Sequence, residues 1–364
     1  MTAIEGHEGP ASSACAAVEL VPVIVSVDAT TPKVLTVRSA AGPALPSGYL
    51  DDALDRTLEQ AVRRIVGNEV GIPVRYFEQL YTFGNRERVL GRRALAVAYL
   101  ALAHHQPVHG PGHPEWRSCY DLFPWEDWRV GRPSEIDSVV VPALGRWLEG
   151  SPADLLAVRT ERAELTFGTG QARWDPVRAL DRYEVLYELG LVAEAGEASK
   201  GGPVVTRRAG GAPPTVAGAP AAGAPGAGAP AAGAPGAGAP GAGAPGAGAP
   251  GASLGAPLAF DHRRIAAAAL ERLRGKLAYR PVVFEVLPET FTLSTLQQVV
   301  EAFAGQQLHK QNFRRLVATA NLVEPTGEAH VRTGGRPAEL YRFRREVLRE
   351  RPAPGLGLRR LGGL

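Results

Sequence analysis

The side chains in this sequence that are best suited to chemistry belong to the segment Leu308–Ala320. At helical spacing, one face of this segment is apolar and carries Leu308, Phe313, Leu316, Val317 and Ala320. The opposite side carries side chains that can reach DNA, namely Lys310, Gln311, Asn312, Arg314 and Arg315. Lys310 and Arg314 lie one turn apart and suit phosphates or guanine edges, while Gln311 and Asn312 suit adenine. An apolar back and a polar front are what a DNA recognition helix needs, although many charged helix faces are only solvated.

The residues around this segment predict the rest of a DNA-binding module. Ser294 with Gln297 is a capping-box pattern that begins an amphipathic helix ending at Gly305. After the recognition helix, short strand candidates at Leu322–Glu324 and Leu340–Phe343 flank a loop whose glycines, Gly334 and Gly335, suit a hairpin tip. Arg336 follows the tip and is placed to enter a minor groove. Helix, turn, helix and β-wing predict a winged helix-turn-helix over residues 258–351.

A second pattern, around Gly71, concerns pyrophosphate chemistry. Five residues fit the end of the magnesium-binding box of Nudix hydrolases, G-x5-E-x7-R-E-U-x-E-E-x-G-U with U a bulky aliphatic residue: Arg64, Val66, Glu69, Gly71 and Ile72. The other carboxylate positions and the first glycine fall on unsuitable residues, which are Arg56, Ile65, Asn68 and Leu50. One carboxylate is a poor cage for an octahedral Mg²⁺ ion, so we expect no catalytic residue and no metal site here. Taken alone, this helix is more simply an amphipathic helix that ends in E-x-G.

Longer stretches on both halves of the chain resemble one known family. They are FEQLYTFGNRER from Phe77, LAVAYLALA from Leu95, WRSCYDLFPWEDWRVGRP from Trp116, DHRRIAAAALERLRGKLAYRPVVFEVLPETFTL from Asp261, LHKQNFRRLV from Leu308 and GGRPAELYRFRREVLRERP from Gly334. These stretches are similar to the Nudix-related transcriptional regulators of NAD metabolism, and more narrowly to the alphaproteobacterial NAD regulators, which often carry the name Nudix hydrolase. The resemblance covers both ordered regions and is most specific in the C-terminal motifs.

The resemblance implies a function. Members of the family are dimeric repressors of genes for NAD biosynthesis or salvage, and the effector is ADP-ribose or a related NAD metabolite bound by the Nudix-like domain. No cofactor is implied. If the effector binds here, the candidate contacts lie on the box helix and on the strand-to-loop segment that follows it: Arg64, Glu69, Tyr81, Phe83, Asn85 and Arg86. Each of these residues also suits a packing or surface role.

Periodicity supplies the elements that must hold these residues. Strands are predicted at Ala17–Val27, Lys33–Arg38, Val74–Phe83 and Ala94–Ala103, with a helix at Asp55–Gly67. This order is typical of an α+β domain with a mixed sheet covered by helices. Trp116–Trp128 is expected to form an ordered loop or an edge strand. We therefore assign residues 13–132 to a Nudix-like ligand-binding domain.

Further helices are predicted on both sides of a repetitive segment. Pro133–Leu148 and Val177–Leu189 have helical patterns, and Gly190 is a suitable stop, so residues 133–195 form a helical extension. Residues 196–257 are dominated by GAPGA and GAPAA units, which cannot form a core and predict a disordered linker. The repeat itself, residues 210–257, is a coil of ~48 residues that spans roughly 38 Å, so the parts it joins are expected to move independently. Asp261–Leu277 follows as a helix with many cations.

Charge is divided unevenly along the chain. From residue 261 onward there are 18 Lys and Arg against 10 Asp and Glu, a net of +8, whereas the preceding residues carry 22 against 27, a net of −5. An anionic partner for the C-terminal part follows, with duplex DNA ahead of a membrane surface. The first residues lack a signal peptide pattern and the two cysteines are too few for a disulfide framework, so we expect a cytoplasmic protein.

Two other functions remain open at this level. The first is a Nudix pyrophosphatase that hydrolyses ADP-ribose or NADH, with Glu59 or Glu78 replacing the missing magnesium ligands. The second is a C-terminal part that binds RNA or a protein. Regulation through the leading function requires direct contact between the domains or a dimer interface in the C-terminal part, because GAP repeats cannot act as a rigid lever.

Overall fold

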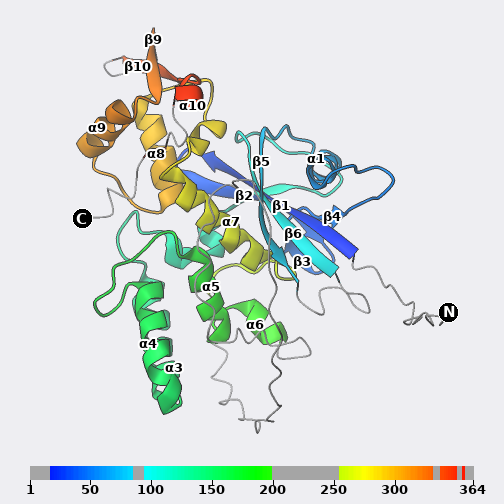
Figure 1. Ribbon diagram of the computed structural model, residues 1–364, viewed down its shortest axis with the longest axis vertical. Coiled ribbons are helices and arrows are strands. Elements are labelled where there is room, and N and C mark those ends of the chain that lie inside the picture. Colours follow the sequence, from blue (N-terminus) through cyan, green and yellow to red (C-terminus); the bar gives the residue numbers. More distant parts are fainter. Residues whose placement is uncertain (1–16, 85–93, 199–253, 331–336, 351–354, 357–364) are drawn as a thin grey trace, which may run out of the picture. The chain divides into compact units, whose positions relative to one another are not determined.

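The computed structural model describes residues 17–84, 94–198, 254–330, 337–350 and 355–356. Its first part is a sheet with the strand order β3-β2-β1-β6-β5, in which β4 also pairs with β1 and β7 with β2 (Figure 1). The strands are β1 (Ala17–Asp28), β2 (Thr31–Ser39), β3 (Gly42–Ala44), β4 (Gly48–Tyr49), β5 (Tyr76–Phe83), β6 (Ala94–Leu102) and β7 (Glu115–Ser118). β1 and β6 are parallel, and the other pairs are antiparallel. The mixed sheet predicted from the strand pattern is confirmed.

Both faces of this sheet are covered, because its central strands are apolar on both sides. In β1, Leu20 and Ile24 pack with the buried face of helix α1 (Leu58–Glu69), which includes Val62 and Ile65. Val21, Val23 and Val25 alternate with them and belong to a second cluster on the other face. This period of two is what a strand buried on both faces requires.

A series of helices follows β7. They are α2 (Cys119–Leu122), one helical turn at Pro124–Glu126, a π-helical turn at Ile136–Val140 that leads into α3 (Val141–Glu149), α4 (Ala153–Phe167), α5 (Ala179–Glu188) and α6 (Ala193–Ala198). Gly190 ends the α5 region in the left-handed conformation, as predicted. α4 was not predicted, because its apolar residues do not form one buried stripe: Leu156 and Val158 are exposed. Within the described ranges, none of the helices is long and apolar enough to cross a membrane.

The C-terminal part begins with α7 (His262–Leu277) and a helical turn at Val282–Glu285. The elements that follow are β8 (Thr290–Phe291), α8 (Leu293–Ala304), α9 (Lys310–Ala320), β9 (Val323–His330), β10 (Ala338–Phe343) and α10 (Val347–Glu350). The three strands pair in the order β8-β10-β9. The predicted order of a winged helix-turn-helix is therefore confirmed.

The N-terminal cap of α8 differs from the capping box expected at Ser294. Thr292 is the cap, and its hydroxyl accepts a hydrogen bond from the Thr295 amide at 3.1 Å. Gln297 reaches forward instead of back, and its amide donates to the Leu308 carbonyl at 2.8 Å. The helix begins earlier because the preceding strand ends at Phe291, which leaves Thr292 in the extended conformation that a cap adopts.

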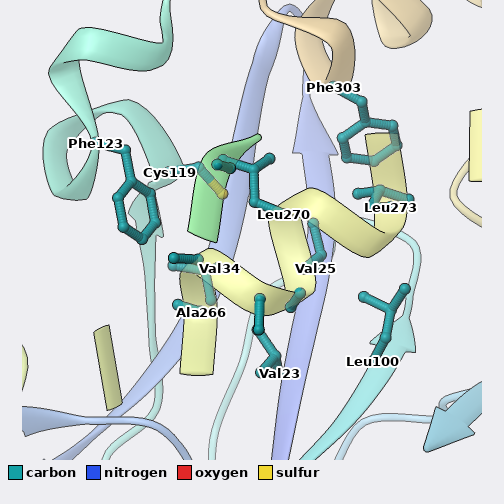
Figure 2. Packing of buried hydrophobic residues seen from close by; sticks show 14 of the residues in the cluster. Val23, Val25, Val34, Leu100, Cys119, Phe123, Ala266, Leu270, Leu273 and Phe303 are labelled. Carbon is teal, nitrogen blue, oxygen red and sulfur yellow. The ribbon is translucent and has the colours of Figure 1, made fainter. Parts of the chain in front are cut away.

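Helix α7 packs on the sheet face opposite α1. Figure 2 shows Ala266, Leu270 and Leu273 of this helix against Val23 and Val25 of β1. The gap that remains among these side chains is apolar and barely large enough for one water molecule, so it is a packing defect and not a ligand site. Segments on both sides of the GAP-rich repeat thus share one hydrophobic core, whereas the composition of the repeat suggested parts that move independently.

The described ends of the GAP-rich segment are joined by hydrogen bonds. The Leu254 amide donates to the Leu191 carbonyl at 2.9 Å, and the Ala256 amide donates to the Asp121 carbonyl at 2.8 Å. Arg263 reaches the Leu254 carbonyl at 2.9 Å and the Glu194 carboxylate at 2.7 Å. Residues 196–198 and 254–257, expected in the linker, therefore belong to the folded part, and the remainder of the expected linker lies outside the described residues.

Shortening this segment is expected to leave the fold intact. If residues 201–252 are replaced by about eight Gly and Ser residues, the new chain spans up to ~26 Å when extended, enough to join ends already held together. The loop between residues 198 and 254 becomes about fivefold shorter, which raises the free energy of unfolding by about 1.4 kcal/mol. Urea denaturation of the full chain and the shortened chain measures the difference. Loss of cooperative unfolding in the shortened chain would contradict the shared core.

Candidate functional site

Helix α9 presents the predicted DNA-binding residues to solvent. Phe313 and Val317 are 0% and 2% exposed and hold the helix on its domain. The residues predicted to contact DNA are exposed, apart from the half-buried Asn312: Lys310, Gln311, Arg314 and Arg315. Over the part of the chain that the structure describes, the three cations of this set form no ion pair. α9 is therefore a fixed helix with an uncompensated positive face.

The wing is described at its base only. β9 and β10 pair from Val323↔Phe343 to His330↔Ala338, and Arg342 forms an ion pair with Glu324 at 2.6 Å. Asn321 ends α9 in the left-handed conformation and turns the chain into β9. The predicted tip glycines and Arg336 lie outside the described residues.

The cations of α7 have a different role from those of α9. All five pair with carboxylates from the N-terminal part: Arg263 with Glu194, Arg264 with Glu184, Arg274 with Glu126, and both Arg272 and Lys276 with Glu78. The charge asymmetry between the two parts is thus partly internal complementarity. The charge asymmetry is therefore weaker support for DNA binding than the net charges suggested. The prediction of DNA binding rests instead on the exposed face of α9.

Glu126 forms the center of a buried ionic cluster. Its carboxylate accepts hydrogen bonds from Arg182 at 2.5 and 2.9 Å and is also bonded by Arg274. The three side chains are almost inaccessible, with Glu126 1%, Arg182 0% and Arg274 4% exposed. Burial by itself would raise the pKa of Glu126, but the two guanidinium groups outweigh it and hold this pKa below its usual range.

The cluster contains two guanidinium groups and one carboxylate, and backbone carbonyls and an aromatic ring stabilise the extra positive charge. Arg182 donates to the Thr166 and Asp175 carbonyls at 3.1 and 2.9 Å and lies 3.8 Å from the center of the Trp174 ring. Arg274 donates to the Pro176 carbonyl at 3.0 Å and to the Phe303 carbonyl at 2.9 Å. Phe303 lies in the last turn of α8, where the helix dipole favors a cation.

The box-helix candidates, Arg64 and Glu69, lie on α1. Arg64 binds the side chain of Asp55 through two nitrogens, at 2.9 and 2.6 Å, and this hydrogen bonding holds the pKa of Asp55 below its usual range. Glu69 lies at the end of the helix, where its carbonyl accepts from the Gly112 amide at 3.3 Å. Gly71 follows with a φ of +70°, a left-handed conformation that ends the helix. The end of α1 therefore explains the glycine of the E-x-G pattern.

The strand candidates, Tyr81 and Phe83, face α7 on the opposite side of the sheet. Arg272 lies 5.7 Å from the center of the Tyr81 ring, and Arg264 lies 5.4 Å from that of Phe83. Phe83 is 5% exposed and Tyr81 is 38% exposed. The structure therefore does not bring these two together with the pair on α1. Asn85 and Arg86 lie outside the described residues.

The carboxylates suggested as alternative magnesium ligands are also apart. Glu59 and Glu69 lie at opposite ends of α1, separated by about 15 Å at a rise of ~1.5 Å per residue. Glu59 pairs with Arg63 at 2.8 Å, and Glu78 pairs with Lys276 at 2.6 Å on the α7 side of the sheet. Two ligands of one ion lie within a few ångströms of each other, so this set cannot form the magnesium site of a pyrophosphatase.

Comparison with known proteins identifies the module that carries α9. Residues 283–343 match the family model described as the NrtR DNA-binding winged helix domain. A curated relative from Acinetobacter baylyi, an ADPR responsive transcriptional repressor NtrR, is 38% identical over 91 residues. The match covers 25% of this chain and 36% of the relative, so the chain spans about a third of the length of the curated relative it matches.

Two solved structures from Shewanella oneidensis are also similar. NrtR in complex with a 27mer DNA is 21% identical, covers 90% of this chain and 94% of its own, and has a TM-score of 0.45. The NUDIX domain of NrtR in complex with ADP ribose is 25% identical, covers 32% of this chain and 80% of its own, and has a TM-score of 0.29.

The ionic cluster around Glu126 was missed by the sequence analysis. Its one visible signal was the segment Trp116–Trp128, which is aromatic and acidic and was expected to be ordered. Arg182 and Arg274 gave no signal, because arginines on amphipathic helices are usually exposed. Their pairing with Glu126 depends on how α5 and α7 pack, which periodicity does not report.

Proposed function

We propose that this chain is a DNA-binding transcriptional repressor of NAD metabolism genes, and that its Nudix-like domain senses ADP-ribose or a related NAD metabolite. The observation that carries the proposal is the exposed cationic face of α9, within residues that match a DNA-binding winged helix domain. A helix with a buried apolar back and an exposed polar front fits the major groove.

The α9 side chains contact different parts of the DNA in this proposal. Arg314 and Arg315 reach guanine edges or phosphates, Lys310 holds a phosphate one turn earlier, and Gln311 and Asn312 read adenine. Arg336 contacts the adjacent minor groove from the wing. Because one short helix reads only a few base pairs, we propose that a homodimer binds two half-sites of a duplex operator.

The effector is proposed from the curated relative, whose name states that it responds to ADPR. Arg64 and Glu69 are the proposed effector contacts on the α1 face, with Asn85 and Arg86 after β5. Tyr81 is proposed at the exposed edge beside α7, and the buried Phe83 has a packing role. Hydrolysis of the effector is not proposed, because Glu59, Glu69 and Glu78 do not converge. Such a regulator acts in the cytoplasm, where it meets both DNA and metabolite.

Binding of the full chain to DNA tests this proposal. Fluorescence anisotropy is measured with a duplex from the promoter of its own gene and with a scrambled duplex of the same length, at moderate salt. We expect tighter binding to the promoter duplex and a change in Kd when ADP-ribose, NAD or nicotinamide mononucleotide is titrated. Equal affinity for both duplexes, with and without these metabolites, would refute the proposal, and magnesium-dependent release of AMP would favor a hydrolase.

A further inference from the structure

The C-terminal end of α8 is held by donors from outside the helix. The Tyr120 hydroxyl donates to the Ala302 carbonyl at 2.6 Å, and Arg274 Nε donates to the Phe303 carbonyl at 2.9 Å. The Trp128 amide donates to the Gly305 carbonyl at 2.7 Å. Carbonyls at a helix end have no partner within the helix, so these donors fix where α8 ends. We refer to Tyr120, Trp128 and Arg274 as the α8 clamp.

The backbones on the two sides of the clamp are close together. Gly305 has φ +70°, and a Cβ atom there would lie 2.4 Å from the Glu126 carbonyl oxygen and 2.6 Å from an Arg274 nitrogen. Only glycine tolerates both a positive φ and such a close contact with neighbouring atoms. The end of α8 therefore docks at one position on the segment from Tyr120 to Glu126.

The turn after α8 transmits this position to α9. The Leu308 backbone amide donates to the Glu301 carboxylate at 2.8 Å, and the side-chain amide of Gln297 donates to the Leu308 carbonyl at 2.8 Å. Both side chains belong to α8, so the turn is fastened to that helix. Phe313 is fully buried and holds the next helix. A shift of the end of α8 therefore shifts α9 as well.

The other side of the clamp is attached to the sheet. Its segment follows directly from Ser118, the last residue of β7, which pairs with Lys33 in β2. Arg274 is held by Glu126, which Arg182 holds in turn. A short chain of buried and half-buried hydrogen bonds thus joins the segment after β7 to the turn before α9, and it provides the direct contact that a GAP-rich linker cannot.

We propose that Tyr120 and Arg274 are positioning residues for DNA binding, which fix α9 relative to the sheet domain and carry the influence of a metabolite bound there. The proposal rests on the proposed function for the identity of DNA and metabolite. Two recognition helices must match two half-sites at a set spacing, so a looser α9 binds operator less well. Coupling between two sites requires an element that both sites bias, and the clamp is that element.

Tyr120→Phe tests the clamp with the smallest change, since it removes only a hydroxyl. We expect the Kd for the promoter duplex to rise by up to about tenfold, the limit reached if the whole net contribution of this buried hydrogen bond serves to hold α9 in its binding position. We also expect the change in Kd caused by ADP-ribose to shrink, while the Kd for ADP-ribose itself, measured by calorimetry, stays the same. Arg274→Lys keeps the charge beside Glu126 but cannot also reach the Phe303 carbonyl, so it is expected to act in the same direction.

Tyr187→Phe on α5 is the matched control, a half-buried tyrosine that lies against Tyr183 and is expected to behave as wild type. If Tyr120→Phe folds and keeps both the wild-type Kd and the wild-type response to ADP-ribose, the clamp proposal is wrong. If the wild-type chain binds no duplex, the proposed function fails instead. In that case hydrogen exchange still tests the clamp: the Phe313 and Val317 amides are expected to exchange faster in Tyr120→Phe but not in Tyr187→Phe, and equal exchange would overturn the clamp.

Discussion

Replacing Arg314 and Arg315 by Ala is expected to weaken operator binding by roughly 2–6 kcal/mol, at ~1–3 kcal/mol for each base-reading contact. Both side chains are exposed on α9, and the buried Phe313 and Val317 hold that helix without them. The fold is therefore expected to be unaffected, so circular dichroism and the urea midpoint should match the wild type. Anisotropy titrations with promoter and scrambled duplexes measure the loss.

Two further variants distinguish base recognition by α9 from a general effect of positive charge. Changing Arg56 and Arg146 to Ala removes the same charge from exposed positions in the N-terminal part, and we expect little effect on operator affinity. Changing Arg314 and Arg315 to Lys keeps the charge but loses the planar fork, so the preference for the promoter duplex should fall more than the affinity for the scrambled one. An equal loss in the Arg56 and Arg146 variant would show that α9 is not the recognition helix.

Glu126→Leu is expected to lower the free energy of unfolding by about 3–5 kcal/mol, the usual cost of leaving buried charges without their partner. The substitution leaves Arg182 and Arg274 buried side by side with no carboxylate between them. Their carbonyl acceptors remain, but two like charges in a medium of low polarity repel each other. Urea denaturation followed by tryptophan fluorescence measures the change.

Glu188→Leu provides the control for a carboxylate of the same kind at the surface. Glu188 pairs with Arg162 at 2.7 Å, and about a third of each side chain is exposed. A pair of this type contributes ~0–1 kcal/mol, so this variant should unfold nearly as the wild type does. If Glu126→Leu unfolds at the same urea concentration as Glu188→Leu, then Glu126 does not hold the core together.

The elements that carry the candidate DNA interface could be predicted because each has its own periodic signature. The alternation in β1 and the two faces of α9 appear in short windows of sequence, and the structure retains both. The capping pattern at α8 was predicted two residues too late, because several hydroxyl residues adjoin the start of the helix. The ligand candidates depended on the box helix and the β5 side chains sharing one face of the sheet, whereas Tyr81 and Phe83 face α7, on the side away from α1.

The sequence by itself determined most of the segments that form helices and strands, α4 excepted, and which helix presents cations to solvent. Only the tertiary structure decided that α7 packs on the sheet, that Glu126 joins Arg182 and Arg274, and that the ends of the GAP-rich segment meet. The reason is physical: helical and strand periods are local properties of the chain. Any carboxylate can pair with any guanidinium group, so the choice of partner depends on the path of the folded backbone between them.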